Sequence, residues 1–228
     1  MSKISKRLKD ARARIEPGKI YRPEEAIDLV KSTAGLKFDA TVEVHAHLGI
    51  DPKKGDQIVR ASVVLPHGSG KKVKVAAFVP EAYAKDAKSA GADIVGGDEL
   101  IEQIKKDGKC DFDIAVTVPE MMKNLAGIAK VLGQKGLMPN PKTGTIDTDV
   151  KKMISELKAG KVSFKNDDTG NVHTAIGKAS YTAEQLLANF QVFVEVLKKA
   201  KPQSMKGTYL LGLYLTSTMG PSIKVSIN

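Results

Sequence analysis

The chain has 228 residues, of which 42% are hydrophobic, so it can form one large domain or two ordinary ones, each with its own core. It carries 36 Lys and Arg against 26 Asp and Glu, and the net charge of +10 favours a polyanionic partner over an acidic small molecule. Cys110 is the only cysteine, which excludes an internal disulfide and a thiolate metal site. We find no signal-peptide pattern and no run of ~20 apolar residues, so we expect a cytoplasmic protein without membrane contact.

The first 66 residues predict helices followed by two strands. Pro23, followed by Glu24 and Glu25, is typical of a helix start. From Ala40 to Ile50 apolar and polar residues alternate, and this period of two predicts a strand with one buried and one exposed face. A second strand is expected from about Gln57 to Leu65.

Residues 67 to 158 follow a different pattern, in which short apolar strands alternate with helices. The expected strands are VKVAAFV, ADIVGG and FDIAVTV, and the helices are AYAKDAKSA, DELIEQIKK and PEMMKNLAGIAKVLG. This alternation indicates parallel strands with crossover helices, because parallel neighbours cannot be joined by a tight turn. We expect Asp98 to cap the second helix and Pro119 to occupy the first turn of the third. A loop rich in Gly, Pro and Lys follows, Gly133–Thr145.

The last 70 residues return to strand-like composition around one long helix. After a short helix (VKKMISELKAG), the segments VSFKN and VHTAIGKAS flank the turn DDTGN and predict a β-hairpin. A long amphipathic helix is expected from Thr182 to about Lys199. Two terminal strands are expected on either side of Gly220 and Pro221.

The outer pieces are each too short to close a core alone. We therefore expect an α/β protein in which residues 1–66 and 159–228 form one discontinuous α+β domain of split βαβ type. Residues 67–158 would form an inserted doubly wound α/β domain. The outer pieces carry net charges of +4 and +4 and the middle +2, in agreement with this division. Glycines 68, 70 and 160 lie in the connections near residues 65–70 and 158–161 and predict hinge motion there.

A doubly wound nucleotide-binding enzyme is the main alternative from another functional class. The chain has no GxxxxGK[ST] motif, and HGSGKK at residues 67–72 is too short and precedes its strand. No Ser, His and Asp grouping has the spacing of a nucleophilic site. His45 and His47 would share a strand face, but without a further ligand they favour an exposed or RNA-facing surface over a metal site. We therefore expect no enzyme activity, cofactor, metal or small-molecule substrate.

Two segments have residue types that suit RNA. Lys37 and Phe38 precede the exposed strand face that begins with Thr41, so a cation, an aromatic ring and a hydroxyl are near one another. Packing of Phe38 in the core is the alternative. Residues 216–222 place hydroxyls on both sides of Gly220, where a backbone can approach closely. This segment is otherwise only the turn between the terminal strands.

The order of these motifs resembles the bacterial large-subunit ribosomal protein L one family over nearly the whole chain. The motifs are KFDATVEVHAHLGIDPKKGDQIVR, LPHGSGK, GADIVGGDEL, FDIAVTVPEMM, LGQKGLMPNPKTGT, VSFKNDDTGNVHTAIGKAS and TSTMGPS. The resemblance implies a first domain that contains both termini and a Rossmann-like inserted domain. It also implies a role at the mobile stalk beside the tRNA exit site, in which the first domain binds a stem of large-subunit rRNA.

The resemblance also implies site residues and partners. The rRNA contacts would be made by Lys37, Phe38, Thr41, Asp167, Thr169, His173, Thr218, Met219 and Gly220. The loop residues Gly133, Lys135, Gly136 and Lys142 would face RNA or tRNA. Further expected partners are exit-site tRNA, the messenger RNA of its own operon, which several members repress, and other large-subunit components. Many relatives have Lys at the position of Asp168 and Ser at that of Gly212, so contacts there are left open.

Overall fold

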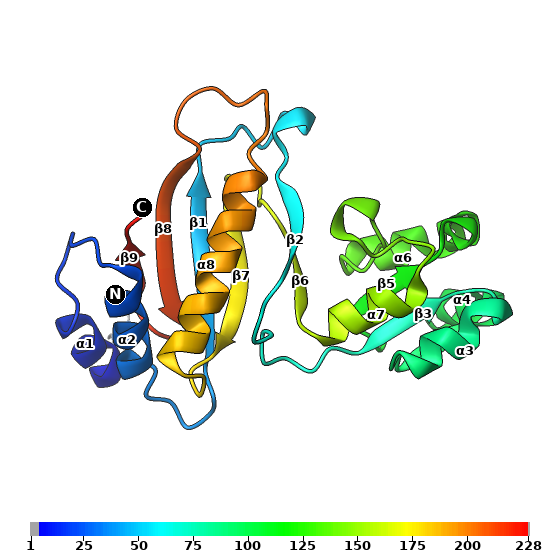
Figure 1. The fold of residues 1–228 in the computed structure, drawn as a ribbon, viewed down its shortest axis with the longest axis horizontal. Coiled ribbons are helices and arrows are strands. Elements are labelled where there is room, and N and C mark those ends of the chain that lie inside the picture. The colour runs from blue at the N-terminus through cyan, green and yellow to red at the C-terminus, as the bar shows by residue number, and fades with distance from the viewer. Residues whose placement is uncertain (1–4, 228) are drawn as a thin grey trace. The chain divides into compact units, whose positions relative to one another are not determined.

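The computed structural model describes residues 5–227, which divide into two compact units (Figure 1). Unit 1 comprises the chain up to Gly70 and from Val162 onward, and unit 2 comprises Lys71–Lys161. The mixture of helices and strands in both units confirms the expected α/β class. None of the helices in this described part of the chain is long and apolar enough to cross a membrane.

Unit 1 contains the strands and helices of both outer segments. They are α1 (Lys6–Ala13), α2 (Pro23–Thr33), β1 (Thr41–Leu48), β2 (Arg60–Val64), β6 (Lys161–Lys165), β7 (Asn171–Lys178), α8 (Ala183–Lys199), β8 (Leu210–Ser217) and β9 (Ile223–Val225). One sheet has the order β7-β1-β8-β9, with antiparallel neighbours, and a smaller sheet pairs β2 with β6. The central strand β1 therefore lies between two strands that come from the C-terminal segment.

The alternation in β1 determines which face of the larger sheet is buried. Val42, Val44, Ala46 and Leu48 are at most 2% exposed, whereas the residues between them remain partly or fully exposed. Helices α2 and α8 pack on the buried face, and Figure 1 shows α8 running across β1 and β7. One hydrophobic core thus includes side chains from both outer segments.

The long helix α8 begins where the sequence indicates. The Thr182 hydroxyl accepts a hydrogen bond from the Gln185 backbone N–H, and the Gln185 side chain accepts one from the Thr182 N–H. This reciprocal capping box satisfies two backbone donors that the first turn leaves without helical partners. The expected start at Thr182 is confirmed.

The expected strand from Gln57 begins three residues later. Residues Gly55–Gln57 form a 3-10 helix, and the strand β2 starts at Arg60. The Gln57 side chain turns back and accepts a hydrogen bond from the Asp51 N–H at 2.8 Å. Gln57 is therefore held in a local turn and is not available to a strand ladder.

The prediction that the strands on either side of DDTGN pair with each other as a β-hairpin is wrong. Strand β6 pairs with β2 and β7 pairs with β1, so the two strands belong to different sheets. Between them there is a tight turn and one isolated bridge, Asn166 to Val172. The Asn166 side chain instead accepts a hydrogen bond from the Val59 N–H at 2.8 Å, which directs this end of β6 toward β2.

Unit 2 has a parallel sheet with the order β4-β3-β5, as the alternating pattern predicts. Its elements are β3 (Val75–Phe78), α3 (Glu81–Ser89), β4 (Ile94–Gly96), α4 (Asp98–Asp107), β5 (Ile114–Thr117), α5 (Met122–Leu125), α6 (Ala129–Gln134) and α7 (Val150–Lys158). The 3-10 helices are Pro119–Met121, Ala126–Ile128 and Pro141–Thr143. Every residue of β3 is fully buried, which is typical of a parallel strand covered on both faces.

Two local predictions in unit 2 are wrong. Gly97 is the N-cap of α4, and Asp98 is already the first helical residue. The Asp98 carboxylate accepts a hydrogen bond from the Asn124 side chain at 2.6 Å and therefore contacts a neighbouring helix. The single helix expected from Pro119 is divided into α5, α6 and two 3-10 turns, one of which contains Gly127, a residue of low helix propensity.

Candidate nucleic-acid interface

The larger sheet of unit 1 has one face that the helices α2 and α8 do not cover, which we call the open face. It is formed by alternate residues of three strands: Thr41, Glu43, His45 and His47 of β1, Asn171, His173 and Ala175 of β7, and Gly212, Tyr214 and Thr216 of β8. Apart from Gly212, these residues are partly or fully exposed. From Thr41 to His47 the face extends roughly 20 Å, at about 3.3 Å per residue.

At one end of the open face, the turn Ser217–Gly220 is fixed to the start of β1. The Thr218 hydroxyl accepts a hydrogen bond from the Thr41 N–H at 3.0 Å, and the Thr218 N–H donates to the Thr41 carbonyl at 2.9 Å. The Thr218 hydroxyl is thus engaged within the protein. We infer that Thr218 positions the turn, and that the side chain offered to a partner is its neighbour.

That neighbour is Met219, a residue that is 71% exposed. Its φ of +60° lies in the left-handed region, which favours glycine, and it is the one such non-glycine position among the described residues. The turn is closed by a hydrogen bond of 2.7 Å, which the Gly220 N–H donates to the Ser217 carbonyl. A Cβ at Gly220 would lie 2.3 Å from the Ser217 Oγ and 3.0 Å from the Ser217 carbonyl oxygen, so a larger residue there would force Ser217 to shift.

The segment before β1 lies at the same end of the sheet. Lys37 is exposed and Phe38 is 55% exposed, so the alternative that Phe38 packs in the core is wrong. Asp39 follows, and its carboxylate accepts hydrogen bonds from the Ser180 N–H and hydroxyl. The Lys178 ammonium donates to the Thr41 hydroxyl at 2.9 Å. A cation, an exposed aromatic ring and an exposed thioether are therefore placed around the start of β1.

The turn between β6 and β7 lies toward the other end of the open face and is organised by Asp167. Its carboxylate accepts hydrogen bonds from the Thr169 hydroxyl and N–H, and from the Asn171 N–H and side-chain amide. Burial raises the pKa of Asp167, but these hydrogen bonds outweigh it and hold the pKa well below its usual range. Asp167 therefore shapes the turn, in which Asp168 and Thr169 are exposed.

Histidines from two strands meet in the middle of the open face. The Nδ1 atoms of His45 and His173 lie 2.7 Å apart, and the rings are in an edge-on arrangement. The next pair along the strands brings the His47 Nδ1 within 2.8 Å of the Asn171 Oδ1. Among the contact residues expected from the sequence, His173 is thus close to Asp167 and Thr169, whereas Thr41, Thr218, Met219 and Gly220 form a separate group at the other end.

Some residues of the open face were not identified as site residues from the sequence. Tyr214 is paired with His45, and its ring covers Gly212, where a Cβ would lie 2.9 Å from the ring. Gly212 is therefore buried beneath a tyrosine. The alternation in LLGLYLTS was a signal for Tyr214. Arg7, by contrast, had no local signal, and its guanidinium donates to the Met219 carbonyl at 2.8 Å across 212 residues of sequence.

The predicted contact loop of unit 2 is exposed at Gly133, Lys135, Gly136 and Lys142. Its second half is organised by Asn140, whose side chain accepts a hydrogen bond from the Lys142 N–H at 2.8 Å. The loop then joins the sheet, because the Thr117 N–H donates to the Thr145 carbonyl at 3.1 Å. Lys135 and Lys142 are thus placed on a loop that is fixed to the β5 side of the unit 2 sheet.

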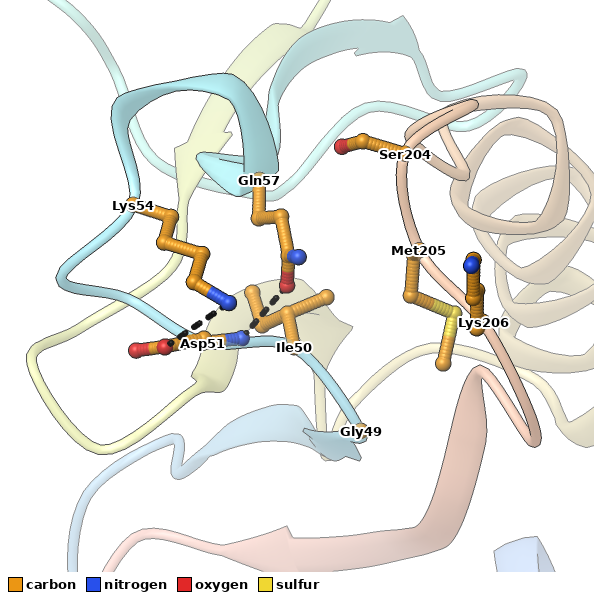
Figure 2. Close-up of a pocket in the computed structure, with 8 residues that line it drawn as sticks. All are labelled: Gly49, Ile50, Asp51, Lys54, Gln57, Ser204, Met205 and Lys206. Atoms are coloured by element: carbon orange, nitrogen blue, oxygen red, sulfur yellow. Dashed lines mark hydrogen bonds and ion pairs between the residues drawn. The ribbon is translucent and has the colours of Figure 1, made fainter.

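A cavity of about 510 Å³ lies elsewhere in unit 1 (Figure 2). One side is lined by Gly49, Ile50, Asp51, Lys54 and Gln57, and the other by Ser204, Met205 and Lys206. The polar groups on the first side are bonded to one another, because Gln57 accepts from the Asp51 N–H and Lys54 lies 3.7 Å from the Asp51 carboxylate. The cavity is separate from the open face residues and shows no set of side chains directed at a small molecule.

Among residues 5–227, no three His, Cys, Asp or Glu side chains are placed to hold a metal ion. The parallel sheet of unit 2 has the strand arrangement of nucleotide-binding proteins, but its strands are followed by Pro80, Gly97 and Val118 without a glycine-rich phosphate loop.

Fold and face together define a class of protein, a two-unit α/β chain whose discontinuous unit exposes a polar and aromatic sheet face. Comparison with protein families gives the particular family. The chain belongs to the ribosomal protein L1p/L10e family, whose model matches residues 29–221. The resemblance seen in the seven sequence motifs is thereby confirmed.

Curated relatives match over essentially the whole chain. The large ribosomal subunit protein uL1 of Mesoplasma florum is 51% identical over 228 residues, which are 100% of each chain. The protein of the same name from Mycoplasma capricolum is 50% identical over 225 residues, 99% of each chain. That of Corynebacterium efficiens is 49% identical over 225 residues, 99% of this chain and 95% of the relative.

Proposed function

We propose that this chain is a structural constituent of the large ribosomal subunit and binds large-subunit rRNA through the open face of unit 1. Support comes from its family and from relatives that are named as large ribosomal subunit proteins. Its surroundings are then the cytoplasmic ribosome, and its partners include other components of the subunit. The role is structural, with no enzyme activity and no cofactor.

The observation that carries the RNA-binding proposal is the fixed turn Ser217–Gly220. Two hydrogen bonds join Thr218 to Thr41, and the next residue, Met219, has a left-handed conformation and is 71% exposed. Phe38, 55% exposed, precedes Thr41 by three residues. Exposed apolar groups fixed in position and surrounded by hydroxyls, amides and lysines suit unstacked bases and ribose, which single-stranded and looped RNA presents.

The finer role follows from the same face. We propose that the bound rRNA stem forms the mobile stalk of the subunit and that this stalk assists release of deacylated tRNA from the exit site. The exposed loop residues Lys135 and Lys142 of unit 2 would contact RNA or tRNA. We further propose that the open face binds messenger RNA of the chain's own operon and represses its translation, because one face can bind two RNAs of similar shape.

The test measures binding to a short rRNA stem that carries the stalk site, against a scrambled stem, at two salt concentrations. We expect the native chain to prefer the stalk stem by about 10³, a specificity gap typical of protein–DNA recognition that we carry over to RNA. Met219→Ala and Phe38→Ala should each reduce that preference. Thr218→Ala combined with Met219→Ala should remove it, because the turn then loses both its exposed side chain and its attachment to β1.

A matched control is Ile20→Ala. Ile20 is 55% exposed, as Phe38 is, but it does not belong to the open face. It should leave the preference unchanged. Equal binding of both stems, with affinity that changes only with salt, would show a general polyanion surface and would contradict the proposal. The enzyme alternative predicts instead that nucleotides raise the melting temperature and that the stem does not.

A further inference from the structure

Four titratable side chains form a continuous row across the open face, which we call the histidine network. Glu43 and His45 belong to β1, His173 belongs to β7, and Asp167 belongs to the turn before β7. The His45 and His173 Nδ1 atoms are 2.7 Å apart. At the two ends, the His45 Nε2 lies 3.7 Å from the Glu43 carboxylate and the His173 Nε2 lies 3.4 Å from the Asp167 carboxylate.

The short distance between the two Nδ1 atoms restricts where the protons can lie when both imidazoles are neutral. One Nδ1 must donate to the other, so one ring carries its hydrogen on Nδ1 and the other on Nε2. The shorter carboxylate contact, to Asp167, favours the Nε2 hydrogen on His173. His45 is then the Nδ1 donor, and its Nε2 carries a lone pair that faces Glu43.

The histidine network can accept one added proton in its present geometry, but a second proton would disrupt it. A proton on the His45 Nε2 replaces the contact between a lone pair and a carboxylate with an ion pair to Glu43. A proton on the His173 Nδ1 would place two N–H groups face to face at 2.7 Å, so the rings would have to separate. The pair therefore accepts a single proton without rearrangement.

We propose that His45 and His173 form one shared proton site on the open face, and that it takes up a proton when RNA binds there. This inference rests on the RNA-binding function proposed for the face. With neutral histidines the network holds two carboxylates and no cation, which opposes an approaching phosphate. Uptake of a proton changes the net charge of the network from −2 to −1 and supplies an imidazolium. RNA binding and proton binding therefore favour each other.

The other groups around His45 favour its neutral form in the chain without RNA. On its own strand it has Glu43 and His47 as neighbours on the same face, and on β8 it is paired with Tyr214. In the free chain, burial and His173 lower the pKa of His45, while Glu43 raises it, and the net effect is a decrease. The site is therefore mostly neutral at pH 7 until a further anion approaches.

The first experiment follows the histidine rings by nuclear magnetic resonance in the full chain without RNA. We expect the Nδ1 and Nε2 signals of His45 and His173 to respond together to a single protonation, with the Nε2 hydrogen on His173 before that protonation. Responses of the two rings that are independent of each other would overturn the shared site.

The second experiment measures the affinity for the stalk stem from pH 7.5 to pH 5.5 at fixed salt. Uptake of one proton permits a change of at most about tenfold per pH unit, and we expect a total gain of roughly threefold to tenfold as the pH falls. His45→Gln, which cannot titrate in this range, should lose most of this pH dependence. His67→Ala removes a histidine from outside the open face and should retain it.

The outcomes separate this inference from the function on which it rests. Stem binding with the same pH dependence in the native chain and in His45→Gln overturns the proton site and leaves the RNA-binding function standing. Loss of stem preference in the native chain at every pH overturns both. A gain in affinity on acidification that is present in the native chain and in His67→Ala, and is reduced in His45→Gln, supports the shared site.

Discussion

The central strands of the two units differ in how many of their faces are buried. In β1 of unit 1, buried and exposed residues alternate, so this strand has a face available to a partner. In β3 of unit 2, all four residues from Val75 to Phe78 are fully buried. Unit 1 can therefore carry a binding surface on the sheet itself, whereas unit 2 can offer only its loops and helices. A binding site on a sheet face has its side chains set by strand register, and a site on a loop depends on local turns.

The largest expected effects come from the two cores. Phe193 of unit 1 and Phe78 of unit 2 are fully buried, each against a second phenylalanine. Replacement of either by alanine should cost about 3–5 kcal/mol. We expect Phe193→Ala to increase hydrogen exchange in unit 1 and to weaken stem binding. Phe78→Ala should increase exchange in unit 2 and leave stem binding at the native level. Loss of stem binding in Phe78→Ala would show that the sheet face of unit 1 does not act alone.

The next largest loss of stability is expected where residues 67 and 68, in the first connection between the units, are bonded to Asn189. The buried side chain of Asn189 accepts from the His67 N–H at 3.1 Å and donates to the carbonyls of Gly68 and Ile176. Asn189→Ala would leave these backbone groups without partners, at a cost of about 1–3 kcal/mol. Glu195→Ala, on the exposed side of the same helix, should have little effect on stability.

Asn189 also refines the proposed hinge. It fixes residues 67 and 68 to unit 1, while the Lys158 ammonium donates to the Val73 carbonyl within unit 2. We therefore propose that hinge motion is concentrated between these anchors, and that Asn189→Ala broadens the distribution of distances between labels on the two units. A single narrow distribution in the native chain would contradict the hinge.

A smaller effect is expected at the attachment of the turn Ser217–Gly220. Thr218→Ala removes the hydroxyl that accepts from the Thr41 N–H, and should lower the free energy of unfolding by about 1 kcal/mol. Stem binding should weaken in parallel. Thr218→Ser keeps the hydroxyl and should restore both properties. If Thr218→Ser binds the stem as weakly as Thr218→Ala, the threonine methyl group and not the hydrogen bond is what matters.

The smallest effect is a dependence of stability on pH at Asp167. Hydrogen bonds hold the folded-state pKa of this carboxyl below its unfolded value, which is about 3.9. The stabilisation is therefore fully present above that value and is lost as the pH falls through the folded pKa. The difference in melting temperature between the native chain and Asp167→Asn should be constant from pH 8 to pH 5 and should shrink below about pH 4. A difference that grows on acidification would contradict this assignment.

Local features of the fold could be predicted from the sequence because they depend on neighbouring residues. The alternation from Ala40 to Ile50 predicts β1 and its exposed face, and the amphipathic pattern from Thr182 to about Lys199 predicts α8 and its start. Strand pairing depends on distant residues, and there the prediction of a β6–β7 hairpin failed. The Asp98 cap failed for a similar reason, since its carboxylate contacts Asn124, 26 residues away.

Contacts between distant residues also limited what the sequence could predict about the candidate site. The exposed position of Phe38 and the left-handed Met219 required the structure, because each residue type is also common in a core. The contact between His45 and His173 joins residues 128 apart in the sequence, and only the pairing of β1 with β7 places them together. The distinction between Thr218, which positions the turn, and Met219, which is presented by it, likewise depends on bonds that no motif shows.

RNA binding by the open face is tested most directly by mapping which backbone amides of the full chain change when the stalk stem binds, by nuclear magnetic resonance or hydrogen exchange. We predict that the changes lie in β1, β7 and β8, in residues 167–171 and in residues 217–220. The buried strands of unit 2 should remain unchanged. Changes confined to α2, α8 or the loop Gly133–Thr145, with the open face unaffected, would contradict the proposal that this face binds RNA.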